Sequence, residues 1–137
     1  MKHKYLLIIF LVINFIGYSQ NENDIQKYQA KTISASLYDN NNKLISEKLF
    51  GKEVKIDYDK VFKSYTVTFY NEHYKLIKKK FIFISQDEDG YKKMESDTGE
   101  NVIIIDTLEN GGLIIQTATT KENTTLIFIT SKTTKLK

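Results

Sequence analysis

The stretch that decides the fold is residues 64–85, SYTVTFYNEHYKLIKKKFIFIS. Its first part alternates: Tyr65, Val67 and Phe69 fall on one face, and small polar residues fall on the other. Side chains of an extended strand point alternately to opposite faces, so this pattern predicts a half-buried β-strand. A polar turn near Asn71 leads into a second strand, and so short a connection joins antiparallel neighbours. The stretch therefore predicts an antiparallel hairpin with an aromatic face.

The same two-residue period recurs along most of the chain after residue 20. About nine candidate strands follow at intervals of roughly 8–14 residues, joined mostly by short polar turns, which is a spacing typical of small β-proteins. Gly51 is expected to end one of these strands. The best helix candidate is Asp24–Ala30, which could instead begin the first strand. We expect an all-β domain, an antiparallel meander that closes into a small barrel or half-barrel, with a sandwich as the other architecture.

The N-terminus has the order of a secretory signal peptide. A basic start, Met1–Lys4, precedes the apolar run Tyr5–Ile13, and small and polar residues follow as far as Gln20. The apolar run is shorter than a membrane-spanning helix needs. We therefore expect a signal peptide at residues 1–19 and a single secreted or periplasmic β-domain at residues 20–137, with no transmembrane segment after cleavage. An uncleaved anchor is the alternative.

Composition excludes several classes of protein. The chain has 137 residues, of which 41% are hydrophobic and 27% are charged, as in a soluble single domain. It has no cysteine, so disulfides and zinc–thiolate sites are impossible. Every basic residue is lysine, and residues 20–137 hold 18 Lys against 17 Asp and Glu. This near-neutral balance lacks the electrostatic footprint of a protein that binds nucleic acid.

Three runs are apolar on both faces of their strands: Phe81–Ile84, Val102–Ile105 and Leu126–Ile129. A strand in a sheet with one solvated face should alternate between apolar and polar residues, so each run needs cover on both sides. In a barrel one face fills the lumen. We expect the other face to be covered by a further segment of the chain, by a second copy in a homodimer or by an envelope protein partner.

Residues suited to catalysis are few. After residue 20 the chain has one histidine, His73, in a predicted turn, and it has no nucleophile elbow. Asp57 and Asp59 would share a face of a strand and could act as a carboxylate pair, although a polar turn explains them equally well. The acidic residues Asp87–Gly90 indicate a hairpin turn. We expect no catalytic residues, no metal site and no cofactor.

Lysines and aromatic residues offer two further signals. Lys78 and Lys80 point one way along a strand and Lys79 the other, so they make no single-faced patch. Protection of an exposed strand edge explains them better than contact with an anionic lipid or polymer. The aromatic faces suit either the wall of a small-ligand cavity or ordinary core packing in a small β-domain. The expected ligand-binding residues are Tyr65, Val67, Phe69, Phe81 and Phe83.

The meander, the signal peptide and the chain length together resemble the small secreted lipocalin-like proteins of bacteria, over most of residues 26–130. The resemblance implies an antiparallel barrel or half-barrel outside the cytoplasm, and no residue role is carried over from it. We therefore expect a non-enzymatic binding protein for a small hydrophobic ligand. A structural or protein-interaction module of the cell envelope is the alternative, and a hydrolase or isomerase that uses Asp57 and Asp59 ranks third.

Overall fold

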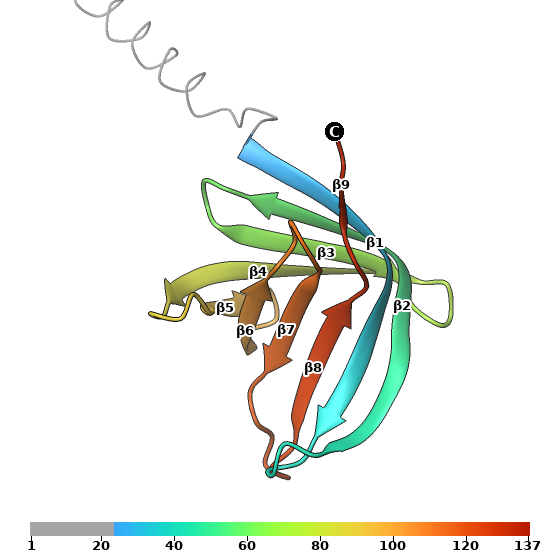
Figure 1. The fold of residues 1–137 in the computed structure, drawn as a ribbon, viewed down its shortest axis with the longest axis vertical. Coiled ribbons are helices and arrows are strands. Elements are labelled where there is room, and N and C mark those ends of the chain that lie inside the picture. Colours follow the sequence, from blue (N-terminus) through green and yellow to red (C-terminus); the bar gives the residue numbers. More distant parts are fainter. Residues whose placement is uncertain (1–23) are drawn as a thin grey trace, which may run out of the picture.

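The computed structural model describes residues 24–137, and their chain forms one antiparallel sheet that curls round on itself (Figure 1). The predicted signal peptide lies outside the described residues. The strands are β1 (Ile25–Tyr38), β2 (Leu44–Asp59), β3 (Ser64–Tyr70), β4 (Leu76–Gln86), β5 (Lys92–Ser96), β6 (Asn101–Asp106), β7 (Leu113–Thr117), β8 (Thr125–Thr130) and β9 (Thr134–Lys135).

Strand β1 closes the barrel. Each strand from β2 to β8 pairs with the next in the sequence, and β1 pairs both with β2 along most of its length and with β8 from Ile33 to Tyr38. The short β9 pairs with the first half of β1, at Tyr28 and Gln29. The expected all-β meander is confirmed, and it forms a closed barrel rather than a half-barrel or a sandwich.

Alternation along the strands fills the lumen. On β3, Tyr65, Val67 and Phe69 are all buried, and the residues between them face outward. The equivalent inward residues of the other strands complete one hydrophobic core. Asp24–Ala30, the helix candidate, belongs almost entirely to β1, because Tyr28 and Ala30 alternate inward with exposed neighbours.

The expectation that Gly51 ends a strand is wrong, because β2 continues through it from Leu44 to Asp59. The glycine instead makes room for an aromatic ring: a Cβ atom at this position would lie 2.2 Å from Cδ2 of Phe69. Just beyond it, Glu53 has a φ of 52°, and the pairing with β3 shifts register between Lys52 and Lys55. The strand is therefore bent at this point, as β-bulges bend barrel strands.

Four hairpin turns share one hydrogen-bonding pattern. A side-chain oxygen of the first turn residue accepts hydrogen bonds from the backbone N–H groups two and four positions later. The residue three positions later has a positive φ. The first residues and their positive-φ partners are Asp39 with Asn42, Asn71 with Tyr74, Asp87 with Gly90, and Ser96 with Gly99. These short polar residues hold the turns that keep consecutive strands adjacent.

Tyr74 is the one member of this positive-φ set whose residue type disfavours the conformation. Its φ is 57° and its side chain is 84% exposed, so it gains no packing there. A non-glycine residue in the left-handed region costs about 1–2 kcal/mol, partly offset by the greater chain entropy of glycine. We predict that Tyr74→Gly raises the free energy of unfolding by about 0.5–1 kcal/mol in urea denaturation.

The matched control is Gly99→Ala in the equivalent position of the β5–β6 turn. Gly99 has a φ of 85°, and an added Cβ would meet nothing within 4 Å, so only backbone strain changes. We expect this variant to lose about 1 kcal/mol. Destabilisation by both substitutions would show that the tyrosine ring contributes to the turn.

Candidate functional site

The two ends of the barrel differ in chemistry. In a meander, alternate turns lie at the same end, so the β3–β4 and β5–β6 turns share one end and the β2–β3, β4–β5 and β6–β7 turns share the other. The end with the β3–β4 and β5–β6 turns holds an apolar cavity, which we call the lumen cavity. The opposite end is filled by hydrogen-bonded tyrosines and charged residues, which we call the polar plug.

The lumen cavity has a volume of about 360 Å³ and a mainly apolar wall. Phe50 joins its two sides: the centroid of its ring lies 5.5 Å from that of Phe69 and 5.0 Å from that of Phe128. The other lining residues are Ile33, Lys48, Leu49, Val67, Asn71, Glu72, Ile77, Lys79, Phe81, Ser96, Glu100, Val102, Ile115 and Thr117. The polar members come mostly from turns and strand ends, so they mark the mouth.

The structure divides the expected ligand-binding residues between the cavity and its surroundings. Val67, Phe69 and Phe81 line the lumen cavity. Tyr65 is fully buried and belongs to the polar plug, while Phe83 packs against the core beneath Lys63, whose Nζ lies 4.9 Å from the ring centroid. Whether any of the five binds a ligand stays a prediction.

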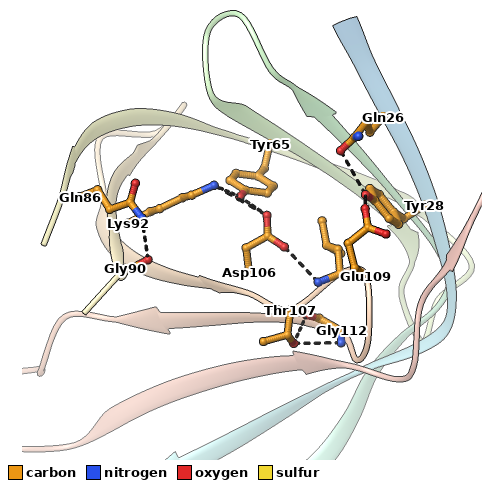
Figure 2. A network of polar contacts seen from close by, with 11 residues as sticks. Gln26, Tyr28, Tyr65, Gln86, Gly90, Lys92, Asp106, Thr107, Glu109 and Gly112 are labelled. Carbon is orange, nitrogen blue, oxygen red and sulfur yellow. Dashed lines mark hydrogen bonds and ion pairs between the residues drawn. The ribbon is translucent and has the colours of Figure 1, made fainter. Parts of the chain in front are cut away.

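Tyr65, Lys92 and Asp106 form the centre of the polar plug (Figure 2). The Tyr65 hydroxyl donates a hydrogen bond of 2.5 Å to Oδ2 of Asp106 and accepts one of 2.6 Å from Nζ of Lys92. Nζ of Lys92 lies 3.7 Å from the same carboxylate oxygen. Strands β3, β5 and β6 are thereby joined across the lumen, although these residues are far apart in the sequence.

Two tyrosine rings also stabilise the positive charge of Lys92. The rings of Tyr58 and Tyr65 stack with centroids 4.7 Å apart. Nζ of Lys92 lies 4.7 Å from the first centroid and 5.0 Å from the second, and its side chain is only 14% exposed. A desolvated ammonium over an aromatic face is attracted by the ring quadrupole. The lysine is therefore held by one carboxylate, one hydroxyl and two rings.

A second tyrosine fastens the edge of the plug. The Tyr28 hydroxyl donates a hydrogen bond of 2.6 Å to Oε1 of Glu109 in the β6–β7 turn, and Oε1 of Gln26 lies 3.1 Å from that hydroxyl. Nζ of Lys135 lies 3.7 Å from the same glutamate oxygen. The hydrogen bond from Tyr28, followed by the charge of Lys135, lowers the pKa of Glu109.

Tyr28 and Tyr65 are weak acids that keep their phenolic protons. Burial is the main cause that raises the pKa of Tyr65 far above its ordinary value, and the hydrogen bond to Asp106 adds to it. Burial and then the hydrogen bond to Glu109 raise the pKa of Tyr28 likewise. Across residues 24–137, no buried side-chain nitrogen or oxygen lacks a hydrogen-bond partner. The plug is thus a satisfied network that closes one end of the barrel.

The other sequence candidates lie away from the lumen. His73 is exposed in the β3–β4 turn beside Glu72, as the sequence predicts. Asp57 and Asp59 flank the inward Tyr58, so they share the outer face of β2, and Oδ1 of Asp59 accepts hydrogen bonds from the N–H groups of Val61 and Phe62. Asp87 holds the predicted hairpin turn. In the described part of the chain, no three His, Cys, Asp or Glu side chains converge on a possible metal position.

The pairing of β4 agrees with the interpretation of Lys78–Lys80 as edge protection. Strand β4 pairs with β3 from Leu76 to Phe81 but with β5 only from Phe81 to Gln86, so in the described residues no strand pairs with the second edge of Lys78–Lys80. Lys78 and Lys80 are exposed, whereas Lys79 is half-buried and lines the lumen cavity. The alternation was visible in the sequence, but the location of the inward face depended on closure of the barrel.

Comparison of the chain with protein-family models, with curated proteins and with solved structures finds no match. The site is therefore interpreted from its own geometry. Within residues 24–137, no helix has the length and apolar character needed to cross a membrane.

Removal of one hydroxyl tests the polar plug. Tyr65→Phe leaves the ring stacked on Tyr58 but deprives Asp106 and Lys92 of a buried partner. We predict a loss of about 1–3 kcal/mol in the free energy of unfolding, measured by urea denaturation. Tyr70→Phe is the matched control, because Tyr70 lies on the same strand but is exposed, and we expect it to change stability by less than about 0.5 kcal/mol.

The raised pKa values of Tyr28 and Tyr65 predict sensitivity to alkali. In the unfolded chain tyrosine loses its proton near pH 10. Above that pH the folded state holds more protons than the unfolded state, so stability falls as pH rises. The melting temperature should be unaffected by these two groups below about pH 10 and should fall above it. The fall should be shallower in Tyr65→Phe; an identical alkaline slope in both proteins would contradict this role.

Proposed function

We propose that the protein is a secreted or periplasmic, non-enzymatic binding protein that holds a small hydrophobic ligand inside its barrel. The observation that carries this proposal is an apolar cavity of about 360 Å³ at one end of a barrel whose other end is closed. Small-molecule sites typically have volumes of roughly 300–1,000 Å³ and mainly apolar walls with a few polar groups. The lumen cavity fits that description.

The physics of burial favours uptake of an apolar molecule. Barrels of about eight strands are just wide enough to be filled by side chains or to hold one small ligand. Here Phe50, Phe69 and Phe128 line space that they do not fill. Transfer of apolar surface from water onto such a wall contributes roughly 25 cal/mol per Å² buried.

The chemistry of the polar residues supports binding rather than catalysis. The plug tyrosines resist ionisation, and His73 and the Asp57–Asp59 pair lie outside the cavity. The wall of the lumen cavity consists mainly of phenyl rings and aliphatic side chains, which neither donate nor accept protons, and its two carboxylates, Glu72 and Glu100, are exposed at the mouth. Export rests on the signal-like segment at residues 1–19. We expect the exported protein to begin near Gln20, which intact-mass measurement would establish.

Obstruction of the cavity tests the proposal. Ile77 lines the lumen cavity from β4, so Ile77→Trp should fill space that a ligand would use. We predict that the wild-type protein enhances the fluorescence of an apolar naphthalene dye and that Ile77→Trp weakens this binding about tenfold or more. Ile82→Trp is the control, because Ile82 lies on the same strand and is 52% exposed on the outer face.

Folding of both variants is checked by circular dichroism. Equal dye binding by the wild type and Ile77→Trp, together with weaker binding by Ile82→Trp, would place the dye on the outer surface and contradict the proposal. Failure of the wild type to bind any apolar dye would contradict it as well.

An apolar patch on the outer face favours a second candidate function, an interaction module of the cell envelope. Ile105 pairs with Ile114, and Ile114 pairs with Ile129, which is 39% exposed. Ile105 and Ile114 are half-buried, and the cover expected for the doubly apolar runs stays a prediction. Light scattering distinguishes the two: a stable dimer that Ile114→Lys dissociates would support this second function.

A further inference from the structure

We propose that the lumen cavity selects amphiphiles with one anionic head group and that Lys79 binds the head. A long-chain carboxylate is the simplest molecule of this class. The inference rests on the proposed function and specifies its ligand: the apolar tail would lie among the phenylalanines, and the negative charge would lie against the lysine.

Lys79 belongs to the wall of the cavity rather than to its rim. On β4 it is flanked by Ile77 and Phe81, the preceding and following inward residues, and across the sheet it pairs with Val67. All four side chains line the lumen cavity. An ammonium group in such a wall loses part of its hydration. An anionic partner can replace the electrostatic stabilisation that water would have provided, whereas apolar neighbours cannot.

Burial distinguishes Lys79 from the other ionisable residues of the cavity. Lys48, Glu72 and Glu100 are exposed, and the Glu72 side chain is 77% accessible to water. Lys79 is half-buried. Charges in water interact weakly across distance, whereas a partly desolvated charge interacts strongly. The attraction of Lys79 for an anion therefore outweighs repulsion by the two glutamates at the mouth.

Lys79 also lacks an internal counter-ion. The ion pairs of residues 24–137 are His73–Glu72, Lys92–Asp106 and Lys135–Glu109, and none includes Lys79. Lys92, at the opposite end of the lumen, is held by Asp106, Tyr65 and Tyr58. Lys92 is thus satisfied by the protein, whereas Lys79 has its positive charge and its donors available to a ligand.

Two molecules that differ only in the head group test the inference. Dodecanoate and dodecanol are titrated into the exported chain near neutral pH, with dye displacement as the readout. We expect the wild type to bind dodecanoate about tenfold more tightly than dodecanol, because a charge-assisted contact forms only with the carboxylate. Lys79→Gln should remove this preference and leave dodecanol binding within about twofold.

Two further variants isolate the charge at position 79. Lys80→Gln removes a lysine from the outward face of the same strand and should retain the preference for dodecanoate. Lys79→Arg keeps the charge and should restore most of the preference lost in Lys79→Gln, provided that circular dichroism shows both variants folded.

The outcomes separate the two proposals. If the wild type binds neither molecule nor any apolar dye, the proposed function fails. If it binds both molecules equally, or if Lys79→Gln leaves the preference intact, the function stands and the role of Lys79 is overturned. Tighter binding of dodecylamine than of dodecanoate would show that Glu72 and Glu100 govern the mouth, and it would also overturn the inference.

Discussion

Closure of the sheet through β1 is the constraint on which the rest of the molecule depends. This strand is long enough to pair with β2 along most of its length, with β8 in its second half and with β9 in its first. Once β1 pairs with both β2 and β8, the sheet forms a ring, and every second residue of its strands must point into one shared lumen. The inward residues then compete for a fixed volume, and their sizes decide where space remains.

That competition produces the difference between the two ends. At the plug, stacked tyrosines and the Lys92–Asp106 pair fill the lumen and satisfy one another. At the other end the inward residues are phenylalanines and aliphatic side chains, which leave the lumen cavity open between them. Gly51 contributes to this arrangement, because its missing side chain lets the Phe69 ring lie against β2. The plug stabilises the barrel, so the cavity end need not be filled for the fold to persist.

Much of the fold could be predicted from local pattern, because alternation and turn chemistry act between near neighbours in the sequence. The alternation of Tyr65, Val67 and Phe69 in the sequence predicts that they share a face, and Asp39 and Asp87 indicate turns. The plug could not be predicted, since Tyr65 meets Asp106 only through the register of three strand pairings. The prediction that Gly51 ends a strand failed for a related reason. The sequence alone does not distinguish a glycine that ends a strand from one that makes room for the ring of a residue distant in the sequence.

Lys92 and Lys79 show how one residue type acquires different roles from its neighbours. Lys92 lies among groups that accept hydrogen bonds from its ammonium group, carry the opposite charge or present a π face, so its charge is compensated inside the fold. Lys79 lies among Ile77, Phe81 and Val67, and within residues 24–137 no ion pair or cation–π contact holds its ammonium group. An ammonium on a flexible stem tolerates several positions of an anionic partner, unlike the rigid fork of an arginine. In a chain without arginine, an unpaired lysine in an apolar wall suits a ligand whose tail length varies while its charge does not.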